Sequence, residues 1–482
     1  MRKLLGVSGI AFAVLLTAAP ATAQQIYFGN LHAHTAYSDG SGTPAEAYAA
    51  AARAGLDFMA VTEHNHKAAE GTGDRRDHLL IANQPSLYSG SDSSSLISAA
   101  RAATVEGRFV AIYGQEFSTI SSGNHVNVFD VPAVIDAQDG AYDDLLGWLG
   151  RHLATGGQPG LVQFNHPEDE EGQPNDYGRD DFGDDDRWLA AMDPYVELIE
   201  VLNAPALKDG VDFRSRRHER KYFEYLNLGF HLAPSVGHDN HYRNWGRSTD
   251  ARVAVIADRL TKPAILSALR ARHAYATEDK NLRIIFRANG ALSGDITTPP
   301  ALGSELALTV EISDPDEPDA SYLVDVFVDE PGGEPMKKAF EVFRLQGDTR
   351  GAARLEGVSF SAPGQYVLLR VRQRNEHGEQ DRAWTAPVWF EYPQAEDAPL
   401  VSRDGAAAVI SGPRIVALLP NPAGAETHNE SATLRNDSRV AVDLTGWRLR
   451  DLAEKEWRLS GLLGPGGEFV VKRAGQPMAM NN

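Results

Sequence analysis

The sequence predicts an α/β domain with a barrel-like sheet, followed by smaller all-β domains, and three observations support this fold class. From residue 26 to about 280, short apolar runs alternate with helical patterns, as in a parallel α/β domain. After residue 281 the helix signals stop and apolar and polar residues alternate with a period of two, which is typical of a β-sandwich. Histidines with the spacing of metal ligands lie in compact clusters before residue 242. Each cluster closes an apolar run, which is where an α/β barrel presents its reactive side chains.

The length and composition indicate a globular protein of several domains. With 482 residues, of which 42% are apolar and 23% charged, the chain can build roughly two to four packed domains. It has no cysteine, so disulfides, thiolate metal ligands and a cysteine nucleophile are excluded. A formal net charge of −20 argues against nucleic acid or an anionic membrane as a partner.

Residues 1–23 have the features of a secretory signal peptide. Arg2 and Lys3 provide a positive start, an apolar run extends from Leu4 to Ala19, and Ala-Thr-Ala at 21–23 supplies a cleavage site. An uncleaved membrane anchor is less favoured, because the apolar run is short and is interrupted by glycine and serine. We therefore expect an exported protein, periplasmic or secreted after cleavage near Ala23, with no membrane span.

Seven strand candidates alternate with helices in the predicted α/β domain, residues 24–281. The first helix has the clearest signal, because Thr43 and Glu46 form a capping box and Pro44 occupies the first helical position. Seven strands with intervening helices indicate a barrel-like sheet, with the histidine clusters at the carboxyl ends of the strands. The candidates are Ile26–Leu31, Asp57–Val61, Phe109–Gly114, His125–Phe129, Leu161–Phe164, Val196–Val201 and His231–Val236.

Two all-β domains are expected after the α/β domain. Residues 282–392 are predicted to form a β-sandwich, 393–412 a linker, and 413–482 a second, Ig-like all-β domain with a hairpin turn at 464–467. The acidic segment 168–186 is interpreted as a solvated loop, because it lacks the spacing of a calcium-binding loop. The strand candidates are 306–312, 322–328, 366–373 and 388–392 in the sandwich, and 415–419, 429–434, 442–449 and 468–471 in the last domain.

Nine candidate metal ligands lie in the α/β domain. His32 and His34 are two residues apart at a strand end, so both side chains face the same side and can hold one divalent ion. Glu116 ends another run and offers two oxygens, which suit a bridge between neighbouring cations. An isolated histidine is more often an ordinary hydrogen-bonded residue, but nine candidates at strand ends favour a metal site. They are His32, His34, Asp39, His64, Glu116, His125, His166, Asp239 and His241.

These segments resemble the polymerase and histidinol phosphatase (PHP) domain family. The resemblance rests on His-Ala-His-Thr-Ala-Tyr-Ser-Asp-Gly at 32–40, Thr-Glu-His-Asn at 62–65, Gly-Gln-Glu at 114–116, Asn-His-Pro at 165–167 and Gly-His-Asp-Asn-His at 237–241. It implies a distorted (β/α)7 barrel of PHP type, with two or three divalent metal ions (zinc, manganese or iron) at the carboxyl mouth.

The resemblance also implies how the ligands divide. Asp39 stands where some relatives carry histidine, and Glu63 and His238 replace the residues common at their positions, so these two are expected to orient ligands. One metal would take His32, His34, Glu116 and Asp239, a second Glu116, His125 and His166, and a third Asp39, His64 and His241.

Metals held by nitrogen and carboxylate ligands favour hydrolysis. Water on such a metal drops toward a pKa of ~7 and becomes a hydroxide nucleophile, while the cations stabilise charge on the reacting oxygens. His66 is a candidate proton donor to the leaving group, and Arg243 and Arg247 are candidate phosphate-binding residues. The alternatives are a rim position for His66 and structural salt bridges for the arginines.

The favoured function is an exported multinuclear metal-dependent hydrolase, a phosphoesterase that acts on a small-molecule ester. Residues 271–282 and 382–389 resemble the PHP branch that includes carbamate hydrolases, so a carboxyl-ester or carbamate hydrolase is the first alternative. A non-catalytic metal-dependent binding scaffold is the second. Residues 430–436 and 443–447 resemble a lamin-tail domain, apparently truncated, which would bind a surface or a protein partner.

Overall fold

The computed structural model describes most of the chain from residue 24 onward. The predicted signal peptide, the linker 393–412 and residues 464–466 of the predicted turn lie outside the described residues. Within the described part, no helix is long and apolar enough to cross a membrane. The described ranges are 24–66, 79–90, 92–117, 124–154, 161–167, 176–203, 216–317, 320–329, 338–346, 353–374, 380–391, 413–419, 431–436, 442–444, 447–450, 456–459, 462–463 and 467–472.

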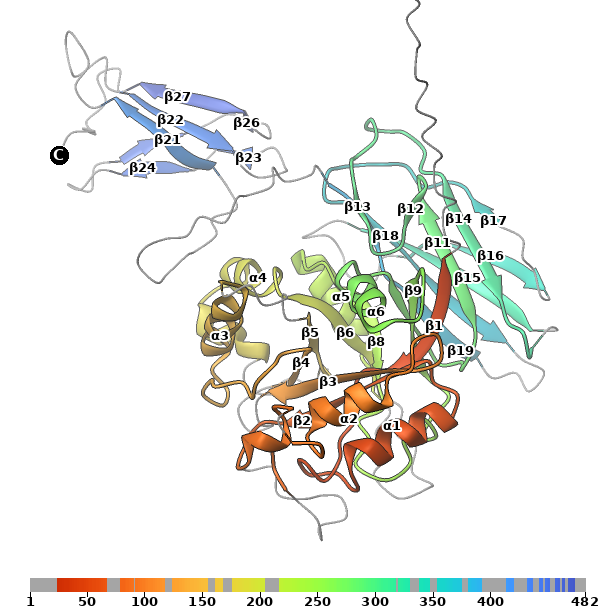
Figure 1. Cartoon of the computed structure of the whole chain (residues 1–482). Coiled ribbons are helices and arrows are strands. Elements are labelled where there is room, and N and C mark those ends of the chain that lie inside the picture. Colours follow the sequence, from red (N-terminus) through yellow and green to blue (C-terminus); the bar gives the residue numbers. More distant parts are fainter. Residues whose placement is uncertain are drawn as a thin grey trace, which may run out of the picture.

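Each of the seven strands expected in the α/β part is present, with helices around them (Figure 1). The strands are β1 (Gln25–Asn30), β2 (Phe58–His64), β3 (Val110–Phe117), β4 (Val126–Phe129), β5 (Leu161–Phe164), β6 (Val196–Asn203) and β8 (Ala233–Gly237). The helices are α1 (Pro44–Arg53), α2 (Leu96–Ala103), α3 (Tyr142–Ala154), α4 (Asp185–Met192), α5 (Glu219–Leu228) and α6 (Lys262–Arg270). Shorter elements are η2 (Pro85–Leu87), η3 (Asp176–Phe182) and β7 (Arg216–Arg217).

The first helix begins as its sequence predicts. The Thr43 side chain accepts a hydrogen bond from the Glu46 amide, and the Glu46 carboxylate accepts one from the Thr43 amide at 2.8 Å. This reciprocal capping satisfies amides that have no partner inside the helix. The segment between β1 and α1, which carries several of the candidate ligands, is thereby tied to the start of α1.

The seven strands follow one another in a single sheet. Hydrogen bonds join them in the order β1-β2-β3-β4-β5-β6, and β8 pairs with β6. Beyond the two outer strands, the His34 amide donates to the Asn240 carbonyl and the Asp239 amide donates to the His32 carbonyl, both at 2.9 Å. The segments that follow β1 and β8 therefore lie side by side at the carboxyl ends of these strands.

One strand runs against the expectation of a parallel sheet. β4 is antiparallel to both β3 and β5, whereas β1, β2 and β3 are parallel to one another, as are β5, β6 and β8. The segment between β3 and β4 is only 118–125, which is too short for the crossover that a parallel neighbour requires. His125 accordingly precedes β4, at the start of the predicted strand His125–Phe129 and not at a carboxyl end.

The sheet continues from the α/β part into the β-sandwich. β9 (Arg252–Ala257) pairs with β1, β10 (Ala274–Thr277) pairs with β9, and β19 (Gln380–Thr385) pairs with β10. β18 (Tyr366–Arg374), β15 (Ser321–Asp329), β16 (Lys338–Gln346), β20 (Val388–Phe390) and β13 (Ile296–Thr297) extend this layer. The second layer contains β12 (Ala291–Leu292), β11 (Arg283–Ala288), β14 (Leu308–Ser313) and β17 (Ala353–Leu355).

The core of the sandwich includes side chains from the α/β part. Ile26 and Phe28 of β1 and Tyr275 of β10 lie in the same buried apolar cluster as Phe286 of β11 and Val371 of β18. The expected boundary between residues 281 and 282 is thus crossed both by sheet hydrogen bonds and by a shared core.

The last described segments are also built of strands. β21 (Pro413–Leu419), β22 (Ser431–Asn436) and β27 (Glu468–Lys472) form a three-stranded antiparallel sheet. β23 (Val442–Asp443) pairs with β26 (Leu462–Leu463), and β24 (Arg448–Arg450) pairs with β25 (Glu456–Arg458). A small apolar cluster holds them together and includes Leu434, Leu444, Leu459, Leu463 and Val471.

Candidate metal centre

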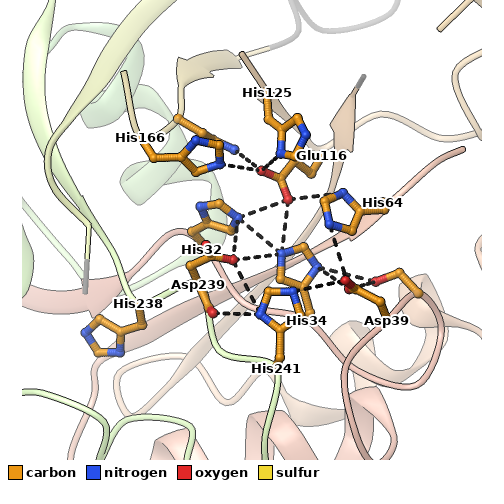
Figure 2. A network of polar contacts seen from close by, with 12 residues as sticks. His32, His34, Asp39, His64, Glu116, His125, His166, His238, Asp239 and His241 are labelled. Atoms are coloured by element: carbon orange, nitrogen blue, oxygen red, sulfur yellow. Dashed lines mark hydrogen bonds and ion pairs between the residues drawn. The ribbon is translucent and has the colours of Figure 1, made fainter. Parts of the chain in front are cut away.

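All nine predicted ligands gather at one end of the sheet (Figure 2). Most lie at or just after the carboxyl ends of β1, β2, β3, β5 and β8. His125 reaches the same place from the amino-terminal start of β4, because that strand is antiparallel. The residues form three groups. Within each group the ligand atoms lie within 4.8 Å of one another, so each group could hold a metal ion.

The first group contains His32, His34, Glu116 and Asp239. The Nε2 atoms of His32 and His34 are 3.2 Å apart. They lie 3.1 and 3.0 Å from Glu116 Oε2, and 3.4 and 3.2 Å from Asp239 Oδ1. Two imidazole nitrogens and two carboxylate oxygens thus face one point, and the group matches the first set that the PHP resemblance implies.

The second group contains Asp39, His64 and His241, as expected, and adds His34. Asp39 lies 3.2 Å from His241 Nε2 and 3.7 Å from His64 Nε2. The His34 ring stacks on both histidines, with centroids 4.6 Å from His64 and 4.4 Å from His241. His34 turns Nε2 to the first group and Nδ1, 3.9 Å away, to Asp39, so it lies between the two groups.

The third group contains His64, Glu116 and His125. His125 Nδ1 and His166 Nε2 lie 2.9 and 3.2 Å from Glu116 Oε1, and His64 Nδ1 lies 3.3 Å from Glu116 Oε2. The expected set of Glu116, His125 and His166 therefore lies together, with His64 beside it. Glu116, which is 1% exposed, is common to the first and third groups.

One polar atom of this cluster is left without a hydrogen-bond partner. His125 Nε2 is buried and unpaired, although leaving such an atom unsatisfied is costly. Imidazole nitrogens and carboxylate oxygens are the donors that zinc, manganese and iron accept. The residues present therefore fit divalent cations.

The electrostatics of the cluster couple its imidazoles to its carboxylates. Burial lowers the pKa of His34, but hydrogen bonds to Asp239 and Glu116 outweigh it and raise that pKa to about 10. Burial raises the pKa of Glu116 and of Asp239, yet the surrounding imidazoles hold both well below their usual range. The carboxylates are therefore ionised, and a cation would compete with protons for the imidazole nitrogens.

Glu63 supports the ligand loop, as the sequence predicts. Its fully buried carboxylate accepts hydrogen bonds from the Thr35 amide at 3.1 Å and from the hydroxyls of Thr35 and Ser38. The Ser38 hydroxyl lies 3.3 Å from His34 Nδ1. Glu63 thus orients His34 through Ser38, and burial raises the Glu63 pKa to about 7.

His238 does not contact a ligand side chain, contrary to expectation. Its Nε2 lies 2.8 Å from the Ala251 carbonyl, and its ring points away from the cluster (Figure 2). Burial and the neighbouring Arg252 lower its pKa to about 3. The backbone amide of His238 donates a hydrogen bond to Asn30 Oδ1, which also accepts a hydrogen bond from the His32 amide. His238 therefore contributes to the centre through its backbone only.

Glu200 is a buried carboxylate beside the ligands that the sequence analysis missed. It is fully buried, and its Oε1 lies 2.7 Å from His32 Nδ1. The signal that could have found it is a glutamate within the apolar run Val-Glu-Leu-Ile-Glu-Val-Leu of β6. A second missed contact comes from Asn165, whose Nδ2 donates to Glu116 at 2.9 Å.

The three candidate catalytic residues have different surroundings. The His66 ring lies 5.0 Å from the His64 ring, and its Nδ1 is buried and unpaired. Arg243 instead donates a hydrogen bond to the Glu46 carboxylate of α1 at 2.9 Å. This is a structural salt bridge, the alternative to phosphate binding for this arginine. Arg247 is exposed, and its amide donates to the Asn244 carbonyl.

No protein-family model and no curated protein matches the sequence. Among solved structures, the chain is similar to a two-domain protein from Bacteroides vulgatus described as containing a predicted PHP-like metal-dependent phosphoesterase. The identity is 15% and the TM-score 0.41, over 79% of this chain and 100% of that one. It is also similar to an amidohydrolase from Chromobacterium violaceum, with 15% identity and a TM-score of 0.25, over 44% of this chain and 87% of that one. Because both TM-scores are low, the function of this chain is inferred from its own residues.

Proposed function

We propose that this chain is an exported multinuclear metal-dependent hydrolase that acts on small-molecule phosphoesters. The observation that carries the proposal is the sharing of ligands. Glu116 belongs to two of the three groups, as do His34 and His64. Shared ligands bring neighbouring cations close together, as in sites that clamp both oxygens of a displacement reaction. The α/β part is proposed to be the distorted (β/α)7 barrel that the PHP resemblance implies.

The charge balance of the cluster is compatible with more than one cation. Among the described residues, no lysine or arginine forms an ion pair with its five carboxylates. Isolated buried charges are costly, and six surrounding imidazoles are neutral when they bind metal. Two or three divalent cations would compensate these charges. The carboxylates are Asp39, Glu63, Glu116, Glu200 and Asp239.

The site's own residues then have defined roles. Bound divalent cations would supply Lewis-acid stabilisation of developing oxygen charge and would acidify water. Glu116 holds the groups together, Glu63 orients His34 through Ser38, and His66 is the proposed proton donor to the leaving group. A site with three cations has a net positive charge, which favours the anionic oxygens of a phosphoester over a neutral carboxyl ester.

The test is the activity of the metal-loaded mature protein on three chromogenic substrates: p-nitrophenyl phosphate, bis(p-nitrophenyl) phosphate and p-nitrophenyl acetate. Asp239→Ala, with its metal content measured, is the control. Turnover of either phosphate that is lost in the control supports the proposal. Preferential turnover of the acetate supports the carboxyl-ester alternative, and bound metal without any turnover supports a binding scaffold.

Two further parts of the proposal concern the ends of the chain. We propose that residues 1–23 direct export, which amino-terminal sequencing of the secreted or periplasmic protein would test by finding Gln24 first. We propose that the strands from residue 413 onward form a lamin-tail-like domain that binds a surface or a protein partner. Deletion of 413–482 would then abolish that binding without changing catalysis.

A further inference from the structure

We propose that Glu200 is a positioning residue that couples two parts of the metal centre, an inference that rests on the proposed function. Glu200 lies in β6 and belongs to none of the three ligand groups. Its two oxygens accept hydrogen bonds from four neighbours. Oε1 lies 2.7 Å from His32 Nδ1 and 3.2 Å from Gln163 Nε2, and Oε2 lies 2.8 Å from the His166 amide and 2.9 Å from Asn203 Nδ2.

The contact with His32 fixes the tautomer and the orientation of its imidazole ring. His32 Nε2 faces Glu116 and Asp239 in the first ligand group, so Nδ1 must carry the ring proton whenever Nε2 binds a metal. A carboxylate 2.7 Å from Nδ1 selects that tautomer and holds the ring orientation. It also makes the imidazole a stronger ligand.

The contact with His166 fixes a strained piece of backbone. His166 has a φ of 29°, in the left-handed region that residues with a side chain rarely adopt and that requires support from the surrounding structure. Its amide donates to Glu200 at 2.8 Å, and this orientation brings His166 Nε2 to 3.2 Å from Glu116. One carboxylate thus holds His32 and His166, which belong to different sets of ligands.

The fold aims Glu200 at these partners. The β6–β8 pairing is irregular between Glu200 and Leu202, and a strand irregularity of this kind redirects the neighbouring side chains. Gly237 of β8 makes room for the carboxylate, because a Cβ there would overlap Glu200 Oε1. Neither feature is needed for an ordinary core residue.

The site requires a carboxylate and not merely a polar group of the same shape. Both oxygens of Glu200 face two N–H donors each. A glutamine can be turned either way, but its NH₂ group then always meets one fixed N–H donor, which is either His32 Nδ1 while Nε2 binds a metal or the His166 backbone amide. Glu200→Gln (E200Q) therefore preserves volume while it removes the positioning.

The experiment measures Co²⁺ and Zn²⁺ affinity of the mature full chain and the visible absorption of bound Co²⁺. E200Q is expected to weaken metal binding about 10–100-fold and to change the Co²⁺ spectrum, which reports ligand geometry. The matched control is Glu197→Gln, a change of the half-buried glutamate of β6 whose carboxylate accepts a hydrogen bond from the Val162 amide of β5, 3.2 Å away. Glu197→Gln should bind metal as the wild type does. Thermal unfolding of the metal-free proteins shows that each variant is folded.

The outcomes separate the two proposals. E200Q with wild-type affinity and spectrum would overturn the role of Glu200 and leave the hydrolase proposal standing. A wild type that binds neither metal would overturn the hydrolase proposal itself. If E200Q does not fold, a crystal structure of the zinc-loaded wild type decides. His32 on zinc through Nε2 with Nδ1 on Glu200 supports the inference, whereas Glu200 turned away or bound to zinc contradicts it.

Discussion

At the scale of single residues, Glu116 organises the metal centre. One of its oxygens faces His125 and His166, and the other faces His32, His34 and His64. Asp239, by contrast, belongs to one ligand group only. The two carboxylates are therefore not equivalent.

Glu116→Gln is expected to lower the metal content of the protein more than Asp239→Ala does. Loss of a shared ligand weakens two neighbouring sites at once, whereas loss of an unshared ligand weakens about one site. Glu116→Gln should therefore lower the metal content by more than one ion per chain, and Asp239→Ala by about one. Elemental analysis after dialysis measures both, and equal losses would show that Glu116 does not bridge.

At the scale of elements, the centre depends on where strands end and how their irregularities direct side chains. β4 delivers His125 to the ligand cluster only because it runs antiparallel to its neighbours. The segments after β1 and β8 are fastened to each other by the hydrogen bonds between residues 32–34 and 239–240. Asp239 has a φ of 46° in this junction, so its ligand position is also set by a strained backbone held in place by neighbours.

Gly237→Ala in β8 is expected to weaken metal binding without a large change in fold. The added methyl group would overlap Glu200 and displace it from His32, so the metal affinity should fall in the same direction as in E200Q. Gly150→Ala is the control, because its nearest neighbour would be the Tyr195 hydroxyl at 3.6 Å. Since Gly150 lies within α3, that change should stabilise the protein by about 0.5–1 kcal/mol. Wild-type metal affinity in Gly237→Ala would contradict the prediction.

At the scale of the whole molecule, the α/β part and the sandwich form one hydrogen-bonded structure. β10 takes β19 as its neighbour through Tyr275, Ala276 and Thr277. Glu219 of α5 accepts hydrogen bonds from Arg370 and Trp384 of the sandwich, both at 2.7 Å. The sandwich is therefore part of the support of the α/β part that carries the candidate metal centre.

Truncation should reveal this dependence. A fragment of residues 24–281 would expose the edge of β10 and apolar residues of the shared core, which favours aggregation. We expect it to be insoluble or unfolded, while a fragment of 24–392 should fold and bind metal as the full chain does. Circular dichroism and limited proteolysis distinguish the two, and a stable, metal-binding 24–281 fragment would refute the prediction.

His231 adds a pH-dependent link between the same two parts. It lies 2.9 Å from Asp193 after α4 and 3.0 Å from Glu391 after β20. Burial lowers the pKa of His231, but attraction to the two carboxylates outweighs burial and raises this pKa from 6.5 to about 10. A folded-state pKa above the unfolded one means that the stabilisation is complete below about pH 6.5 and is lost as the pH rises through about 10.

His231→Phe should therefore lower the urea midpoint most at pH 6 and progressively less toward pH 10. Urea unfolding of the wild type and the variant at several pH values between these limits measures the difference. A difference that stays constant over this range would mean that the charge of His231 does not contribute.

The sequence by itself determined the residue types of the centre, the strands that carry them and the all-β character of the later segments. These features are local, because short stretches of sequence determine strand periodicity, capping residues and ligand chemistry. The tertiary structure alone decided that β4 is reversed, that His34 joins two groups, that His238 turns away and that Glu200 meets His32. Glu200 and His32 are 168 residues apart, and side-chain directions beyond a strand end depend on backbone that distant neighbours hold in place.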